Sequence, residues 1–98
     1  MIKITSNDYK LTDANILHIT ESAKKVESGY GDTFIESVFV SMSNGTHRVV
    51  IRGHVSNFVI NSSSEDRKMY AALSSAISKF KRQVRKRKTK LNRKDRNI

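Results

Sequence analysis

Hydrophobic and polar residues alternate at the start of the chain, and their spacing then becomes that of a helix. The alternation predicts a short strand over residues 2–6. Spacings of three and four residues then predict a helix from about 13 to 27. Thr12 is suited to be its N-cap, but position 15 lacks the glutamate that would complete a capping box. The apolar face of this helix consists of Ile16, Ile19, Ala23, Val26 and Tyr30.

From Thr33 the hydrophobic period becomes two, which predicts a strand. Its inward face is expected to carry Phe34, Val38, Val40 and Met42, with Glu36 as an interruption. The dipeptide Asn44-Gly45 follows and predicts a type I′ hairpin turn, because both residues tolerate a positive φ.

The strand that returns from this hairpin repeats the alternation, with Val49 and Ile51 on its apolar face. Ser56-Asn57 is a weaker turn signal. The residues that follow it, 58–61, are predicted to form the last strand.

A long helix is predicted to close the chain. Residues 62–66, Ser-Ser-Ser-Glu-Asp, contain two capping-box matches that predict its start. Its apolar stripe lies within about a third of the helix circumference. The stripe consists of Met69, Leu73, Ala76, Ile77, Phe80, Val84 and Leu91. After Val84, basic residues take positions where apolar ones are due, so the helix is expected to project beyond the domain.

The order of these elements predicts a two-layer α+β domain with the order β-α-β-β-β-α. The first strand–helix–strand unit is expected to join two parallel strands, and the hairpins add the other strands antiparallel. Each helix has a single apolar stripe, so both helices are predicted to pack on one face of a four-stranded sheet.

The positive charge of the chain is concentrated near its C-terminus. The 98 residues include 19 lysines and arginines and 9 acids, for a net charge of +10. Residues 1–78 carry 8 side chains of each sign, whereas residues 79–98 carry 11 basic residues and the single acid Asp95. Such clustering indicates a surface that binds a polyanion. We divide the chain into an α+β domain over residues 1–91 and a basic C-terminal tail over residues 92–98.

Composition excludes several classes of function. The chain has no cysteine, which excludes disulfides, thiolate zinc sites and cysteine nucleophiles. No apolar run approaches the roughly 18 residues of a membrane span, and no signal segment is evident, so a soluble cytoplasmic protein is expected. His18, His47 and His54 lack the spacing of a metal site, and no nucleophile–base pair is apparent. We therefore predict no enzyme activity, metal, cofactor or small-molecule substrate.

The far side of the C-terminal helix is the strongest candidate for a binding surface. Residues at helical spacing form a stripe opposite the apolar one: Lys68, Ser75, Lys79, Arg82, Lys86, Lys90 and Arg93, with Lys81 and Arg85 beside it. No acid lies between Asp66 and Asp95, so neighbouring cations repel one another, which selection for stability alone would not favour. A helix with a cation on each turn can follow phosphates without reading bases.

Two smaller groups of cations have more than one interpretation. Lys24 and Lys25 near the end of the first helix can stabilise that end or contact a polyanion, and the sequence leaves both open. Arg48, Arg52 and His54 are expected on the sheet face without helices, where Phe39 is a candidate for stacking. The sequence lacks the aromatic motifs of RNA-binding sheets, which favours an open polar face.

The closing helix also resembles that of a known family. Lys68-Met69-Tyr70-Ala71-Ala72-Leu73, then Ile77-Ser78-Lys79-Phe80, then Arg82-Gln83-Val84 to Lys86, is similar to the last helix of the ribosome hibernation promoting factors. That helix reads approximately D-M-Y-A-A-I, I-D-K-L and R-Q-L before a lysine-rich end. Leu11-Thr12-Asp13-Ala14 and Lys25-Val26-Glu27 resemble the first helix of the family. The resemblance covers essentially the whole chain.

The resemblance implies a function. Members of the family are β-α-β-β-β-α domains that bind ribosomal RNA of the small subunit in the mRNA and tRNA channel and inhibit translation by occupancy. Lys25, Lys79, Arg82 and Lys86 match cations of the family, and Lys90 follows by helical phase. Together with the residues beside them, the candidate rRNA-binding set is Lys24, Lys25, Lys79, Arg82, Arg85, Lys86 and Lys90.

The expected partners are the small ribosomal subunit and its rRNA. The chain resembles the short type of the family, so ribosome dimerisation would need a separate factor. The alternative is a general double-stranded RNA- or DNA-binding protein that uses the same helix.

Overall fold

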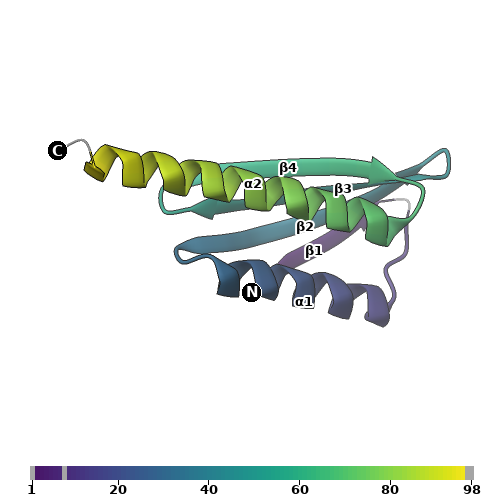
Figure 1. Cartoon of the computed structure of the whole chain (residues 1–98). Coiled ribbons are helices and arrows are strands. Elements are labelled where there is room, and N and C mark those ends of the chain that lie inside the picture. Colours follow the sequence, from purple (N-terminus) through teal and green to yellow (C-terminus); the bar gives the residue numbers. More distant parts are fainter. Residues whose placement is uncertain (1, 8, 97–98) are drawn as a thin grey trace.

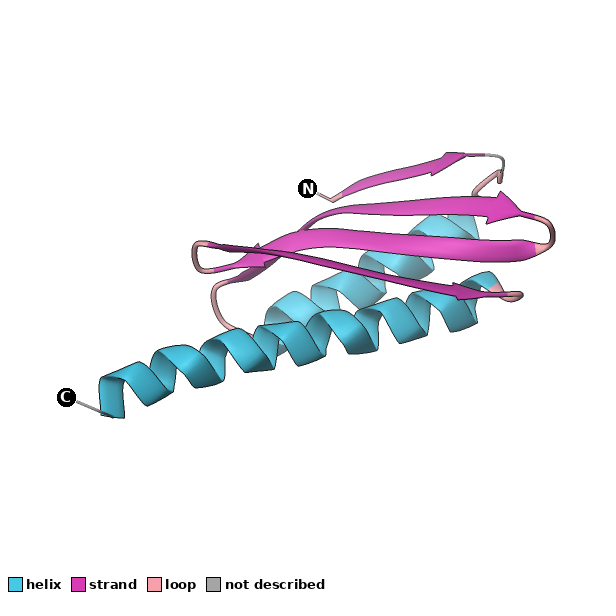
Figure 2. Ribbon diagram, turned by 90° about the horizontal axis from the view of Figure 1, so that it is seen from above, coloured by secondary structure: helices cyan, strands magenta, loops and turns pink. Residues whose placement is uncertain are grey.

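The computed structural model describes residues 2–7 and 9–96, and side chains as far as residue 87. The elements are β1 (Lys3–Asn7), α1 (Asp13–Gly29), β2 (Thr33–Ser43), β3 (Thr46–Val55), β4 (Phe58–Asp66) and α2 (Met69–Arg96). The strands form one sheet in the order β1-β2-β3-β4 (Figure 1). β1 is parallel to β2, and the other pairs are antiparallel. Both helices cover the same face of this sheet (Figure 2), so the predicted two-layer α+β fold is confirmed.

A β-bulge in β2 places some of its side chains on the opposite face of the sheet from the one predicted. The pairing with β3 shifts between Ile35 and Ser37, which leaves Glu36 as the extra residue of a β-bulge. Ile35 and Val38 are both buried although three positions separate them. Phe34 therefore lies on the open face and is 44% exposed, so its predicted inward placement was wrong. Simple alternation fails here because a bulge changes the side-chain period within a strand.

Both short turns form as predicted. Asn44 and Gly45 have φ angles of 52° and 77°, the left-handed conformation that a type I′ turn requires. Ser56 also has a positive φ, of 51°, and the pairing of Val55 with Phe58 closes the second hairpin around two residues. These tight turns keep β2, β3 and β4 in fixed register beneath the helices.

β4 is longer than predicted, and α2 begins later. Residues 62–66, interpreted as a helix start, continue the strand because their backbone pairs with residues 47–51 of β3. The buried Ser62 donates its hydroxyl to the Ala76 carbonyl at 2.9 Å, so it joins the strand to the helix instead of capping it. At the start of α2, Asp66 Oδ1 accepts a hydrogen bond from the Lys68 amide at 3.0 Å. Sheet pairing thus outweighs the local capping signal.

The first helix is capped more completely than predicted. Thr12 Oγ1 accepts from the Asn15 amide at 3.1 Å, and Asn15 Oδ1 accepts from the Thr12 amide at 3.0 Å. Asn15 therefore completes a capping box that was predicted to be incomplete because position 15 lacks a glutamate. On the predicted apolar face, Ile19 is fully buried, but Ile16 at its margin is 40% exposed.

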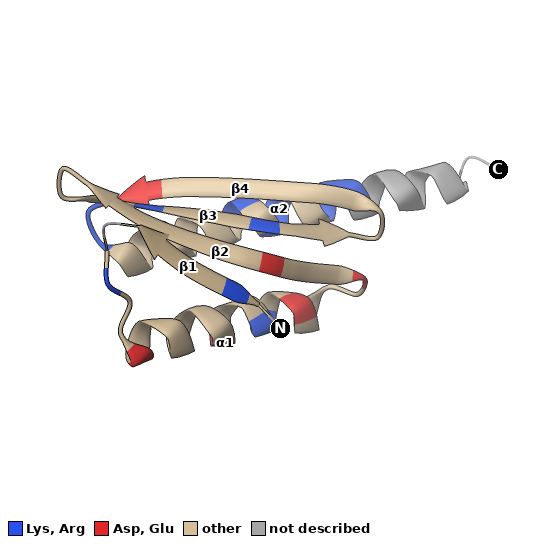
Figure 3. Cartoon of the chain, turned by 180° about the vertical axis from the view of Figure 1, so that it is seen from behind, with Lys and Arg blue, Asp and Glu red and all other residues tan. Residues whose placement is uncertain are grey.

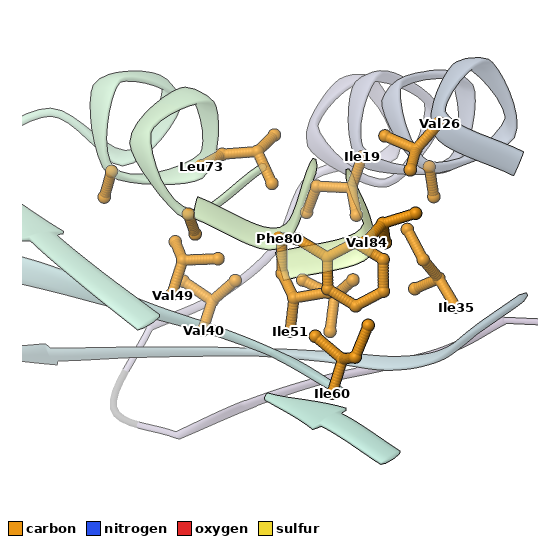
Figure 4. Close-up of a cluster of buried hydrophobic side chains, with 14 of the residues drawn as sticks. Ile19, Val26, Ile35, Val40, Val49, Ile51, Ile60, Leu73, Phe80 and Val84 are labelled. Atoms are coloured by element: carbon orange, nitrogen blue, oxygen red, sulfur yellow. The ribbon is translucent and has the colours of Figure 1, made fainter. Parts of the chain in front are cut away.

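The core lies between the sheet and the two helices, and Phe80 of α2 is at its centre (Figure 4). Its ring is fully buried and lies close to Ile51 and Ile60 of the sheet. Gly53 leaves room for it, since a Cβ there would meet the Phe34 carbonyl and would lie 3.0 Å from Phe80 Cζ. Leu91, predicted to extend the apolar stripe, lies outside the described side chains. Over the described residues, neither helix combines the length and apolarity of a membrane span.

Candidate nucleic-acid interface

The outer surface of α2 carries a row of exposed cations. Met69, Leu73, Phe80 and Val84 are buried and fix the rotation of the helix on the sheet. At about 100° per residue, the opposite side must then point to solvent. The exposed basic side chains there are Lys79, Arg82, Arg85 and Lys86. The helix continues to Arg96, but the side chain of Lys90 lies outside the described residues.

Lys79 differs from the other cations because its ammonium group already has a protein partner. Lys79 Nζ donates to the Ser63 carbonyl at 3.0 Å, and Gln83 Nε2 one turn later donates to the Asn61 carbonyl at 2.7 Å. These two bonds tie α2 to β4. Lys79 remains exposed and keeps two further donors, so it can contact a phosphate only from this fixed position.

Lys25 of α1 faces α2 across a groove between the helices. A hollow of about 290 Å³ is lined there by Lys25 and by Lys81 of α2. Polar residues from both helices line the same hollow: His18 and Ser22 from α1, and Ser74 and Ser78 from α2. Two cations and several hydroxyls that converge on one groove form a suitable site for an anionic group.

Lys24 lies apart from this groove although it precedes Lys25 in the sequence. It is exposed and lines a different hollow, with Thr20 and Glu27. Adjacent helical residues differ by about 100° in direction, so only one of the pair can face α2. Of the two lysines left open by the sequence, Lys25 lies at the groove and Lys24 does not.

Aromatic and amide contacts hold the two helices together at one end of the groove. The rings of His18 and Tyr70 lie 4.3 Å apart between centroids. Asn15 Nδ2 donates to the Tyr70 hydroxyl at 2.8 Å, so the same residue caps α1 and contacts α2. The distance between the helices is therefore set by specific side chains, and the width of the groove follows from it.

The cations of α2 form no ion pair within the described part of the chain. There the single ion pair joins Arg52 to Glu36 at 3.7 Å, on the sheet. Figure 3 shows basic residues and no acidic ones on the coloured part of α2, whereas α1 and the strands carry residues of both signs. An unneutralised positive surface raises the local concentration of polyanions and speeds their association. No group of three or more potential metal ligands occurs among the described residues.

The open face of the sheet is more mixed than predicted. Arg48, Arg52 and His54 lie there as expected, since Val49, Ile51 and Val55 between and beside them are buried. Two phenylalanines share this face, however, because the bulge in β2 brings Phe34 to the same side as Phe39.

The sequence placed Lys81 beside the cationic stripe but not among the candidate rRNA contacts, and it did not identify the serines near Lys81 as part of a site. Lys81 follows Ile77 by one helical turn, on the flank of α2 that faces α1. Its partner Lys25 is 56 positions away in the sequence, so only the packing of the helices reveals the pair. Serines at positions 74 and 78 have helical spacing, but nothing in the sequence alone distinguishes them from solvated residues.

Comparison with known proteins extends this description. The profile of a protein family described as "Sigma 54 modulation protein / S30EA ribosomal protein" matches residues 2–92. A ribosome hibernation promoting factor of Escherichia coli is 31% identical over 90 residues, which are 92% of this chain and 95% of that protein.

Two solved structures have the same fold. The N-terminal domain of Protein Y from Thermus thermophilus superposes with a TM-score of 0.77 at 21% identity, over 86% of this chain and 93% of that domain. A ribosomal subunit interface protein from Coxiella burnetii also gives a TM-score of 0.77, at 14% identity, over 90% of this chain and 97% of that protein. The described elements of this chain thus match both structures in fold.

Proposed function

Because this chain belongs to the sigma 54 modulation protein / S30EA ribosomal protein family, we propose that it is a ribosome hibernation factor. It binds ribosomal RNA of the small subunit in the channel of mRNA and tRNA, and it inhibits translation by occupying that space. The observation that carries this proposal beyond family membership is the cationic surface that runs over α2 and into the groove beside α1.

The geometry of this surface suits a folded RNA. Arg82, Arg85 and Lys86 project from successive turns of a helix whose buried stripe anchors it to the sheet. The groove with Lys25 and Lys81 adds a second line of cations at a fixed distance. Contacts from a rigid surface form together and lose little conformational freedom on binding. Such a surface favours an RNA whose phosphates are themselves held in place.

Phosphate contacts alone are sufficient for inhibition by occupancy. They position a protein on RNA without reading bases, and no covalent step is needed. With about six to ten phosphate contacts, the affinity for ribosomes is expected to fall by about three to five orders of magnitude between about 50 and 200 mM salt. The cytoplasm is the expected location because ribosomes are there, and a ribosome-dimerising factor is a further proposed partner.

The proposed binding unit is the α+β domain over residues 1–91, with residues 92–98 as a basic tail. The same domain is expected to supply Lys25, Lys79, Arg82, Arg85 and Lys86 as rRNA contacts. Lys90 remains a proposed contact, and Lys24 is a weaker one because it lies outside the groove.

The test is co-sedimentation of the purified protein with ribosomes at physiological ionic strength. The double variant Arg82→Glu with Lys86→Glu is expected to lose co-sedimentation, because two attractive phosphate contacts become repulsive. Its circular dichroism should be unchanged, since both side chains are exposed. The matched control is Lys10→Glu with Arg67→Glu, which changes the net charge equally at exposed positions away from this surface.

A competitor separates the ribosome proposal from its alternative. A molar excess of random double-stranded RNA should leave most of the protein on the ribosome. Transfer of the protein to the duplex would favour a general duplex-binding protein. Equal binding by both double variants would show that net charge, and not the surface of α2, determines binding.

A further inference from the structure

The open face of the sheet carries an aromatic platform. Phe34 and Phe39 are 44% and 36% exposed, on the side of the sheet that neither helix covers. Phe34 is paired with His54 across the strands, and their rings stack with centroids 5.6 Å apart and planes inclined by 12°. Val59, which is paired with His54 from β4, is 56% exposed and extends this apolar row.

The second phenylalanine is surrounded by hydrogen-bonding and cationic side chains. Phe39 lies between Thr5 of β1 and Val50 of β3. Arg48 and Arg52 lie two positions to either side of Val50, on the same face, which places each within reach of the Phe39 ring. A partly exposed ring whose cross-strand partner is flanked by two arginines can stack a base while the arginines contact its phosphates.

The acids on this face do not cancel its cations. Arg52 is paired with Glu36 at 3.7 Å, but both side chains are more than half exposed, so the pair is weak and its arginine can change partner. Glu65 is placed near Arg48 by the strand register. With Lys3 of β1 included, the charged side chains of this face are Lys3, Arg48, Arg52, Glu36 and Glu65. They leave an excess of positive charge.

A hollow connects this face to the cationic helix. About 420 Å³ in volume, it is lined by Arg48 and Val50 from the open face and by Lys79 and Gln83 from α2. The hollow passes the edge of β4, where Asn61 and Ser63 add polar groups. A strand of RNA that leaves the surface of α2 can therefore continue onto the sheet through this hollow, whose lining contains no acidic residue.

The arrangement favours unpaired RNA over a protein partner or a duplex. The two phenylalanines are separated along β2 by Glu36 and Ser37, so their rings do not form one continuous apolar patch of the kind that protein partners bury. In a duplex, the base faces are stacked on one another and unavailable. An unpaired segment offers free base faces to the rings, and ribose hydroxyls to the serines and threonines between them.

We propose that this open sheet face is a second RNA-binding surface, which takes an unpaired segment. One base stacks on Phe39, a neighbouring base stacks on the Phe34–His54 pair, and Arg48 and Arg52 hold the phosphates between them. This surface is distinct from the helix surface proposed above, and it can bind a short oligonucleotide even if the ribosome assignment fails.

The direct test uses the absence of tryptophan from the chain. In the variant Phe39→Trp, a single indole replaces the ring, and stacked bases should quench its fluorescence saturably. The probe is an oligoadenylate of about ten nucleotides. An abasic oligomer of the same length and charge is expected to produce little quenching. Leu17→Trp, at a residue that is 58% exposed on α1, is the matched control and should respond to neither. Equal quenching by the two oligomers, or no quenching, would overturn the proposal.

A second pair of variants separates the ring from its bulk. Phe39→Leu is expected to weaken oligoadenylate binding, measured by anisotropy, by about fivefold to a hundredfold, the effect of losing one base–aromatic stack. Phe39→Tyr keeps the ring and should bind like the natural protein. Unchanged oligoadenylate binding in Phe39→Leu overturns the proposal. The proposal is also overturned if the RNA-free natural protein is a dimer in solution and Phe39→Leu is a monomer, because the face would then bind a second copy of the chain. Ribosome co-sedimentation of Arg82→Glu with Lys86→Glu tests the helix surface separately.

Discussion

The two faces of this molecule are built from different chemistry. On the helix side, α2 presents cations and no acids over its described side chains, and aromatic side chains hold the two helices together. The sheet side presents charges of both signs, with exposed aromatic rings between them. A surface of the first kind recognises where phosphates are, and one of the second kind requires bases that are free to stack. Under the two proposals, one small fold would contact both folded and unpaired RNA.

Both faces depend on one support. Phe80 of α2 is buried between the layers, against strands whose opposite side forms the aromatic platform. Surface substitutions should therefore affect one face at a time, whereas loss of this support should affect both. The predictions below use that difference.

The largest effect is expected from Phe80→Ala. Removing a fully buried ring should lower the free energy of unfolding by about 3–5 kcal/mol, because packing is lost and a cavity remains. Urea denaturation followed by circular dichroism measures the loss, and binding to ribosomes and to oligoadenylate should weaken together. Phe39→Leu is the control for removing a ring at a half-exposed site, and its loss of stability should be much smaller. A loss below about 1 kcal/mol in Phe80→Ala would contradict the shared support.

A smaller effect, directed at the sheet, is expected from Gly53→Ala. The added Cβ would meet the Phe34 carbonyl and lie 3.0 Å from both Ile35 Cα and Phe80 Cζ. We expect a loss of about 1–3 kcal/mol in the free energy of unfolding, together with a displaced Phe34 ring. Gly29→Ala is the matched control, because no atom lies within 4 Å of its added Cβ. Equal denaturation midpoints in the two variants would show that the contact around Gly53 relaxes freely.

The smallest effect distinguishes two neighbouring lysines. Lys25→Gln should weaken ribosome binding severalfold and reduce the slope of log affinity against log salt by about one, the value for one lost phosphate contact. Lys24→Gln removes the same charge outside the groove and should change that slope by clearly less. Binding measured over a series of salt concentrations gives both slopes. Identical slopes would mean that the groove does not select between these two positions.

Much of the fold could be predicted because local and tertiary preferences agree. The type I′ turn at Asn44-Gly45 needs positive φ angles that few residue pairs tolerate. The single apolar stripe of α2 can be buried only if it faces the sheet. The prediction was wrong where the two preferences conflict. The serines at 62–64 favour a helix cap locally, but pairing with β3 satisfies their backbone better. The bulge at Glu36 was visible only as an interruption in the pattern.

The candidate site was predictable in its helical part and hidden in the rest. The exposure of Arg82 and Lys86 follows from the phase of a single helix, which the sequence contains. The groove between Lys25 and Lys81 depends on how two helices pack, and the sequence does not give their separation. The aromatic platform depends on the bulge, because strict alternation would have placed Phe34 in the core.

The hydrogen bonds from Lys79 and Gln83 to β4 affect how the protein can associate with other copies of itself. Alternate carbonyls of an outermost strand point away from its sheet, where they can accept a strand from another molecule and begin a growing stack. Here the carbonyls of Asn61 and Ser63 are already occupied by side chains of the same chain. Growth of a polymer through this border of the sheet is therefore disfavoured.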